Sequence, residues 1–524
     1  MSTTTRNAGF ALLAAFFLLL AFFSLTNPRN HSEANDALGY ALTVEQAPAA
    51  QLWHSQHVLY FPTAKLVFLA AQKIGLADRA NPVLIWFSRV CGALTLLAAF
   101  LLLRRRAVAF SAALAGAAAL AFSYGFWRYT NETEIYVPAL LLILLAWLAA
   151  AGAPRLANVI AGALLAALAC LMHLLNVLPA LAAIPLFYLL QRRVRDALLH
   201  GLLAGGLTGG IYLALFGTRV VAEIFDVGSD QPEGGLHLAS FAKGAVALAQ
   251  NVTAGNFLFA SEKFQHALTA LFPYRALARQ IFTGQHADAL SRTLPYATLV
   301  LLVLCAGALL LARLKIRRDK KDFAFTVSLA AWFALYALVV VITEPGGPEN
   351  WVMALPPLLL LVAATLFAPL AAAGRAALPL AFVMLLGLHN YFGAFRLLAD
   401  ESGDLAACKS AWLEQHAQSG DLILNADSFE VMRHLSYYGH AKVIHLTYEV
   451  SETTKPQFFD ELNNCRGRVY ATPDVFAFPP SLQRRFPERA VFLAQLAREL
   501  QPRFAPVFTN EFGVIAALAP TAAP

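Results

Sequence analysis

The stretch HSEANDALGYALTVEQAPAAQLWHSQHVLYFP, residues 31–62, sets the organisation of this chain. Its carboxylates and imidazoles belong to Glu33, Asp36, Glu45, His54 and His57. The segments on either side carry almost no charge. Only 14% of the 524 residues are charged and 59% are hydrophobic, whereas soluble proteins average about a quarter charged residues. This composition predicts a polytopic helical membrane protein with an acidic loop beside the bilayer.

Eleven segments are each apolar and long enough to cross about 30 Å of hydrocarbon as a helix with its backbone hydrogen bonds satisfied internally. They are Ala8–Thr26, Val83–Leu103, Ala107–Gly125, Glu134–Ala151, Ala157–Met172, Leu175–Leu190, Ala197–Gly217, Leu294–Leu311, Phe323–Ile342, Val352–Phe367 and Ala376–Tyr391. No small-residue cleavage pattern follows the first segment, so we expect an uncleaved first helix rather than a signal peptide.

Basic residues collect in alternate short loops of this arrangement. With a cytoplasmic N-terminus, the basic loops on that side contain Arg6, Arg104–Arg106, Arg155, Arg192, Arg193, Arg195, residues 315–321 and Arg375. This pattern predicts a multi-pass membrane protein whose N-terminus is cytoplasmic and whose C-terminus is on the outer side. The net charge of +7 follows from these loops. The basic residues form no stripe, so we expect no nucleic-acid partner.

The segment His57–Gly75 is apolar enough to be a further span. Counting it would place Arg104–Arg106 outside and reverse every later loop. We therefore expect a helix on the outer membrane surface, with Lys65 and Lys73 reaching the headgroups.

The predicted membrane domain covers residues 1–395. Its outer loops are 27–82, 126–133, 218–293 and 343–351. The long outer loop 218–293 is typical of a cap or lid, and its segments 239–250 and 261–272 have the pattern of amphipathic helices.

Residues 396–524 are polar enough to fold in water and predict a small periplasmic α/β domain. Its predicted elements are a helix over 428–438 and strands over 421–425, 442–446, 469–472 and 512–518. Cys408 and Cys465 lie in this domain. Outside the cytoplasm they could form a disulfide, and the sequence leaves both states open.

Asp36 opens a helical pattern that runs from Ala37 to Gln46. The plain interpretation is that Asp36 or a neighbour caps this helix. The functional interpretation is a general base or charge-stabilising carboxylate, with Glu33 as a second acid in the same loop. Burial beside lipid would raise the pKa of Asp36 and nearby cations would lower it. The two interpretations are compatible.

Glu134 lies immediately before a span, where a carboxylate is costly unless it is paired or functional. Arg128, six residues earlier, could simply neutralise it. The outer side also carries residues that could bind a phosphate or a sugar, or could be interface anchors and satisfied polar groups. These candidates are His57, Tyr60, Lys65, Trp127, Arg128, Tyr136, His173, Glu349 and Trp351.

These features resemble the GT-C glycosyltransferases, and in particular the bacterial protein O-mannosyltransferase-like membrane proteins. That family shows a Gly-Asp early in the first outer loop, and Asn35-Asp36 matches the acid of that pair. It shows a Trp and a Glu-Val-Tyr in the second loop, matched by Trp127 and Glu134-Ile-Tyr136. The family's His-Pro-Pro-Gly-Tyr-Pro corresponds to His57-Val-Leu-Tyr60-Phe-Pro62, which lacks the double proline and the glycine. The matched region covers about the first 200 residues.

The resemblance implies a polyprenyl-phosphate-linked sugar as donor, catalysis on the outer face, Asp36 as base and Glu134 as its supporting acid. The acceptor could be a protein, a lipid or a glycan. A divalent metal, Mg or Mn, could bridge Glu134 and the phosphate, although nothing in the sequence fixes a ligand set.

Two other classes of protein fit parts of the sequence. A transporter or flippase for a lipid-linked saccharide would be expected to show paired repeats and acids near the bilayer midplane. This chain shows no repeat, and its acids lie at the outer edge. A non-catalytic envelope assembly protein could use the C-terminal domain for docking.

Overall fold

The computed structural model describes residues 3–32, 34, 36–217, 235–271, 277–316, 322–426, 429–478, 480, 483 and 487–519. The chain divides into two compact units. The helical unit consists of Met1–Pro28, Thr43–Phe257 and Asp288–Ala399, and the α/β unit consists of Arg29–Leu42, Leu258–Ala287 and Asp400–Pro524. The predicted residues Glu33 and Asn35 lie outside the described residues.

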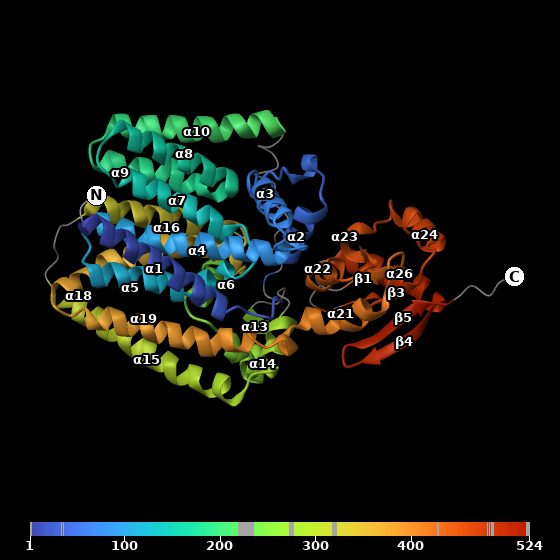
Figure 1. Cartoon of the computed structure of the whole chain (residues 1–524). Helices are drawn as coiled ribbons and strands as arrows, with labels where there is room; N and C mark the ends of the chain where they lie inside the picture. The colour runs from blue at the N-terminus through green and yellow to red at the C-terminus, as the bar shows by residue number, and fades with distance from the viewer. Residues whose placement is uncertain are drawn as a thin grey trace. The chain divides into compact units, whose positions relative to one another are not determined.

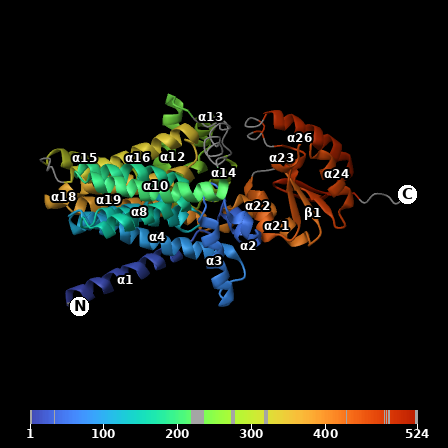
Figure 2. The same ribbon diagram turned by 90° about the horizontal axis from the view of Figure 1, so that it is seen from above.

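The helical unit is built from helices that mostly run side by side, as Figures 1 and 2 show. Helix α7 packs between α4 and α8, and α10 packs against α8. The longer helices are α1 (Thr3–Leu25), α3 (Tyr60–Lys73), α4 (Ala80–Arg105), α5 (Phe110–Phe122), α6 (Tyr124–Thr130), α7 (Tyr136–Ala150), α8 (Leu156–Met172), α9 (Ile184–Leu190), α10 (Val194–Phe216), α12 (Leu238–Val252), α15 (Ala289–Leu314), α16 (Phe323–Thr343), α17 (Leu355–Val362) and α19 (Ala377–Asn390).

Short helical turns complete the unit. They are η1 (Ala49–Leu52), η2 (Leu174–Asn176), η3 (Pro179–Ala183), η5 (Glu349–Ala354), η6 (Ala363–Phe367), α18 (Ala368–Ala372), η7 (Tyr391–Phe395) and α20 (Arg396–Leu398). Helix α2 (Ala37–Gln46) begins among residues of the α/β unit and ends among residues of the helical unit, and η4 (Asn256–Ala260) also contains residues of both.

Within the described residues, six helices are long and apolar enough to cross a membrane: Ala80–Arg105, Val194–Phe216, Ala289–Leu314, Phe323–Thr343, Glu349–Ala372 and Ala377–Leu398. The pair α5 and α6 passes the same test together. Four shorter apolar helices are Gly9–Leu25, Tyr136–Ala150, Leu156–Met172 and Leu174–Leu190. Each predicted span coincides with one of these segments. Several of them do not reach spanning length alone, so the number eleven stays a prediction.

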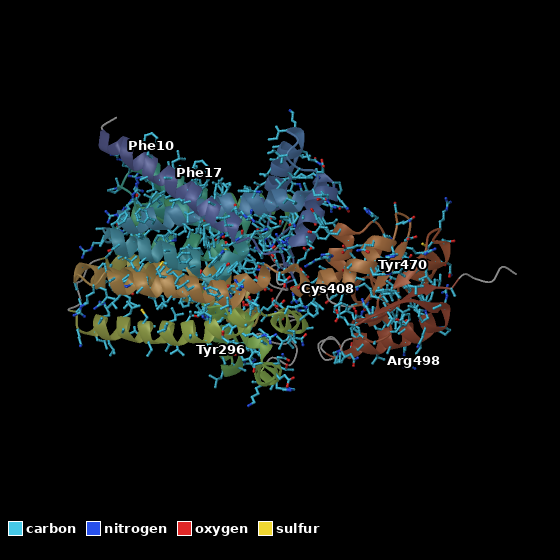
Figure 3. The ribbon with its side chains drawn as sticks, turned by 60° about the horizontal axis from the view of Figure 1, so that its bottom comes forward. Phe10, Phe17, Tyr296, Cys408, Tyr470 and Arg498 are labelled. Carbon is cyan, nitrogen blue, oxygen red and sulfur yellow. The ribbon has the colours of Figure 1, made fainter. Side chains whose placement is uncertain are left out.

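The surface of the helical unit is apolar where a helix faces away from its neighbours. Phe10 and Phe17 project from α1 in Figure 3 and are both more than half exposed. Helix α15 exposes Val300, Val303 and Leu304 in the same way. Exposed side chains of this size suit a hydrocarbon environment, because in water they would form large apolar patches.

A sharp bend separates α5 from α6. The two helices meet at an angle of 65°, because Ser123 between them has an extended backbone and its hydroxyl donates to the Leu120 carbonyl. The sequence predicts one span over residues 107–125 and a loop over 126–133. In the structure the span ends at Phe122, and residues up to Thr130 form the short helix α6.

The α/β unit contains a five-stranded sheet with strand order β2-β1-β3-β5-β4. Its strands are β1 (Leu422–Asn425), β2 (Lys442–His445), β3 (Val469–Ala471), β4 (Phe504–Asn510) and β5 (Gly513–Leu518). Strands β1, β2 and β3 are mutually parallel, whereas β5 runs antiparallel to both β3 and β4. The parallel half is a doubly wound arrangement, with its crossover helices on opposite faces.

Successive side chains of strand β1 point to opposite faces of the sheet, and each face is covered by its own hydrophobic layer. Leu422 and Leu424 of β1 pack with α24 and α26 on one face, and Ile423 packs with α21 and α22 on the other. The helices of this unit are α13 (Glu262–Leu271), α14 (Ala278–Gln285), α21 (Leu405–His416), α22 (Phe429–Tyr438), α23 (Leu446–Glu449), α24 (Lys455–Asn464) and α26 (Pro487–Leu500), with the short turns η8 (Glu401–Gly403), η9 (Pro473–Val475) and η10 (Gln501–Arg503).

The structure confirms the predicted small C-terminal sheet. All four predicted strands are present, and β4 is an additional edge strand that the sequence analysis did not identify. Cys408 and Cys465 are both free thiols. Their sulfur atoms contact the carbonyl oxygens of Ser402 and Gly420, each at 3.5 Å.

Candidate functional site

The helical unit buries a group of charged side chains at the end of α6 and in the turn that follows it. Arg128 and Glu132 form a salt bridge of 2.6 Å between Nη1 and Oε1, with side-chain exposures of 2% and 1%. Glu134, two residues further on, is also buried. The sequence analysis considers Arg128 as a partner of Glu134, and the structure adds Glu132 as the acid one helical turn from Arg128. Buried charges of this kind persist only when they are paired or functional.

Close packing of backbone holds this segment in place. A Cβ added at Gly92 of α4 would overlap Thr130, and one added at Gly125 would overlap the side-chain oxygen of Asn251. Arg89 of α4 donates from Nε to the Asn131 side chain at 2.9 Å. The glycines therefore let α6 approach its neighbours closely enough for these polar contacts to form.

Imidazole and phenol rings from three sequence segments lie together in the same unit. The ring centroids of His57 and His173 are 5.0 Å apart, and those of His173 and Tyr136 are 5.5 Å apart. His54 stacks on His57 at 5.1 Å. The segments are joined by their backbones, because Leu59 donates to the Leu171 carbonyl at 2.9 Å.

Carboxylates are coupled to this ring cluster. Burial raises the pKa of the Tyr60 hydroxyl well above its usual range, and the Glu134 carboxylate raises this pKa further. Glu349 of η5 and Glu134 both interact electrostatically with Tyr129 of α6. Candidate residues from separate predicted outer loops thus converge within the helical unit.

Burial decides the charge state of the two buried histidines. It lowers the pKa of His173 to about 4. It also lowers the pKa of His57 well below its ordinary value of 6.5, and the neighbouring imidazoles act in the same direction. Both rings are therefore neutral near pH 7. Within the described residues, the Nδ1 atom of His57 is buried and forms no hydrogen bond.

Asp36 lies in the α/β unit. Its Oδ1 forms an ion pair with Nη1 of Arg433 on α22, and its Oδ2 accepts a hydrogen bond of 3.2 Å from the Tyr40 hydroxyl. The Asp36 side chain is 41% exposed and that of Arg433 is 22% exposed. The carboxylate is therefore reachable from solvent while it is held by an arginine nearly 400 residues away in sequence.

Several predicted binding residues have structural partners. Trp127 stacks on Phe395 with centroids 4.0 Å apart. Its indole nitrogen donates to Thr26 at 2.8 Å. Trp351 is buried and donates to the Pro345 carbonyl at 3.0 Å. Lys65 donates to the carbonyls of Val44 and Glu45 at 2.5 and 2.9 Å, at the C-terminal end of α2 where a cation is favourable.

Among the residues that the structure describes, no group of three or more His, Cys, Asp and Glu side chains could hold a metal ion. The described residues therefore supply no set of three such ligands for the divalent metal considered from the sequence, and metal use stays a prediction.

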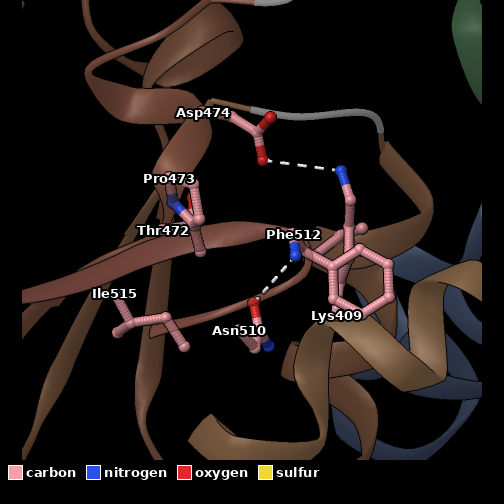
Figure 4. Close-up of a pocket in the computed structure, with 8 residues that line it drawn as sticks. Lys409, Thr472, Pro473, Asp474, Asn510, Phe512 and Ile515 are labelled. Atoms are coloured by element: carbon pink, nitrogen blue, oxygen red, sulfur yellow. Dashed lines mark hydrogen bonds and ion pairs between the residues drawn. The ribbon is translucent and has the colours of Figure 1, made fainter. Parts of the chain in front are cut away.

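Figure 4 shows a small pocket in the α/β unit beyond the carboxyl end of β3. Asp474 and Lys409 face each other across it at 3.7 Å. The Asn510 side chain accepts a hydrogen bond of 3.0 Å from the Phe512 amide at its rim. None of the residues predicted from the sequence lines this pocket, and its two charged groups are paired with each other.

Apolar helices that bury a polar cluster, together with a unit of mixed α/β structure, define a helical membrane protein that carries a small α/β unit. Over its whole length the chain is similar to ArnT from Cupriavidus metallidurans bound to undecaprenyl phosphate. The TM-score is 0.54 and the sequence identity is 13%, over 100% of both chains. At this identity the similarity establishes the fold.

Two other solved structures are similar at lower TM-scores. ArnT from the same organism in the apo state gives 0.48, with 13% identity over 98% of both chains. The Archaeoglobus fulgidus oligosaccharyltransferase complex with Zn and sulfate gives 0.47, with 12% identity over 97% of this chain and 72% of that one. No family model and no curated protein matches the sequence.

Proposed function

We propose that this protein is a glycosyltransferase that moves a sugar from a polyprenyl-phosphate donor to an acceptor at the outer face of the bacterial inner membrane. The observation that carries the proposal is the GT-C fold shared along the whole chain with ArnT, a protein solved with undecaprenyl phosphate. The buried convergence of carboxylates and neutral imidazoles in the helical unit supports it, because polar groups in such a setting are expected to be functional.

In the proposed reaction, Asp36 accepts the proton of the acceptor hydroxyl as its oxygen attacks the anomeric carbon of the donor sugar. The bond between that carbon and the phosphate oxygen breaks, and polyprenyl phosphate leaves with the electron pair. The transition state is oxocarbenium-like. A single displacement inverts the anomeric configuration.

The other candidate residues have supporting roles in this proposal. Glu134 stabilises developing positive charge, with Glu33 as a second acid. Lys65 and Arg128 are candidate cations for the phosphate. His57 and His173, being neutral, bind hydroxyl or phosphate oxygens by hydrogen bonds.

The remaining candidates are four aromatic residues and one glutamate. We propose that Tyr60, Tyr136, Trp127, Glu349 and Trp351 shape the sugar site around these groups. The periplasmic assignment of residues 396–524 and the membrane topology predicted from the basic loops belong to the same proposal.

The test is sugar transfer from a radiolabelled polyprenyl-phosphate sugar to endogenous acceptors in membranes that contain the wild type, Asp36→Asn or Glu134→Gln. Glu461→Gln is the matched control, because Glu461 lies on the exposed face of α24 and pairs with exposed Lys442. We expect transfer to fall at least about a hundredfold in Asp36→Asn, as for loss of a positioned general base, with no change in Glu461→Gln.

Unchanged transfer in both site variants, at equal protein level, would overturn the assignment of the site. A protein that moves the labelled lipid across the bilayer without forming a new glycosidic bond would be a flippase. That result would overturn the proposed reaction.

A further inference from the structure

Both oxygens of the Asp36 carboxylate are engaged by other side chains of the α/β unit. Arg433 takes one oxygen and the Tyr40 hydroxyl shares the other. The guanidinium therefore occupies an oxygen that a general base would use to accept a proton. The contact therefore matters for any reaction in which Asp36 serves as the base.

The Arg433 side chain is held in place by more than its charge. A Cβ added at Gly39 would lie 2.9 Å from Nε and 3.2 Å from Cδ of Arg433, so the arginine packs directly on the bare backbone of α2. On its other side, the guanidinium carbon lies 5.0 Å from the ring centroid of Phe429. A glycine at position 39 is thus what lets an arginine from α22 reach Asp36.

Further contacts attach the segment before α2 to the same unit. Arg279 of α14 pairs with Glu430 of α22 at 2.8 Å and donates to the Ser32 carbonyl at 2.5 Å. The His31 amide donates to the Asp404 carboxylate at 2.8 Å. The ion pair between Asp36 and Arg433 is therefore one of several polar contacts that hold this segment against the rest of the α/β unit.

We propose that Arg433 of the C-terminal domain is a positioning residue that holds the Asp36 carboxylate in the free enzyme. When the donor binds, the Arg433 side chain releases Asp36 and binds the donor phosphate instead. The exchange replaces one anionic partner of the arginine with another, so the guanidinium is paired with an anion before and after donor binding. Bidentate geometry makes arginine well suited to both carboxylate and phosphate. Donor binding would then free Asp36 to act as a base. The inference depends on the proposed function.

The test measures binding of undecaprenyl phosphate to the purified full-length protein in nanodiscs, which needs no catalytic activity. Arg433→Gln is expected to weaken binding about tenfold or more, from loss of a charge-assisted hydrogen bond. Asp36→Asn is expected to strengthen binding several-fold, because the carboxylate no longer competes with the phosphate for Arg433. This gain should shrink when Arg433→Gln is also present. Binding to Arg433→Lys should fall between the wild type and Arg433→Gln.

Two further variants sharpen the test. Gly39→Ala crowds the arginine and should change phosphate affinity while every charge is retained. Arg498→Gln removes an exposed arginine from α26 of the same unit, labelled in Figure 3, and should bind like the wild type. If Arg433→Gln does not fold, Arg433→Lys and Gly39→Ala decide the question.

The inference is overturned if Arg433→Gln binds undecaprenyl phosphate as tightly as the wild type, or if Asp36→Asn does not bind it more tightly. Failure of the proposed function looks different, because wild-type protein would then transfer no sugar, or Asp36→Asn would transfer it normally.

Discussion

Replacing Glu132 by glutamine should destabilise the helical unit strongly. The carboxylate and Arg128 are 2.6 Å apart, and both side chains are at least 98% buried. Arginine cannot lose its proton in a protein, so Glu132→Gln removes a carboxylate charge that lies 2.6 Å from a buried guanidinium. Removing one partner of such a pair costs about 3–5 kcal/mol, a change of roughly 150- to 5,000-fold in the folding equilibrium.

The control for this prediction is an exposed pair in the same chain. Lys442 and Glu461 have side-chain exposures of 62% and 40%, so Glu461→Gln should cost no more than about 1 kcal/mol. A double substitution of the buried pair by apolar residues, Arg128→Met with Glu132→Leu, should recover most of the loss, because it removes both desolvated charges together.

Unfolding by SDS in mixed micelles, followed by tryptophan fluorescence, measures these differences. If Glu132→Gln unfolds within about 1 kcal/mol of the wild type, as Glu461→Gln is expected to, the salt bridge contributes little and the reasoning from burial is wrong.

Two further predictions follow from packing and titration. The unfolded chain takes up a proton at His173 below pH 6.5 and the folded chain only near pH 4, so stability should be complete above pH 6.5 and fall by roughly 3 kcal/mol by pH 4. His173→Gln should flatten this dependence in unfolding titrations between pH 7 and pH 4.5, and an equally steep curve in the variant would contradict the assignment. Gly125→Ala should cost about 1–3 kcal/mol, because its methyl group meets Asn251. Gly209→Ala in α10, where nothing lies within 4 Å, should be neutral or stabilising by up to about 1 kcal/mol; equal thermal midpoints for the two alanine variants would refute the packing account.

The spacing of apolar residues along the sequence predicts the individual helices and strands of this chain. Helix α2 occupies Ala37–Gln46, the range that the sequence pattern predicts, because its apolar spacing is that of a helix. The strands β1 and β2 are likewise close to their predicted ranges, since each is a short apolar run between turn residues. The resemblance of the first two loops to GT-C proteins agrees with the fold shared with ArnT.

Contacts between distant residues could not be predicted in this way. The pairing of Asp36 with Arg433 joins positions 397 residues apart, and no local pattern encodes it. Glu430 and Arg433 lie one turn apart on α22, and charges at that spacing read equally well as a solvated helix face. The bend at Ser123 was also missed, because the apolar run continues across it and only the serine backbone conformation ends the helix.

The most direct test of the central claim is a cryo-EM structure of the protein in nanodiscs with undecaprenyl phosphate. The account predicts phosphate density beside the first outer loop, with Asp36 and Glu134 facing a common cavity that opens to lipid and with Arg433 contacting the phosphate. Phosphate density elsewhere, or carboxylates of Asp36 and Glu134 that face separate cavities, would contradict it.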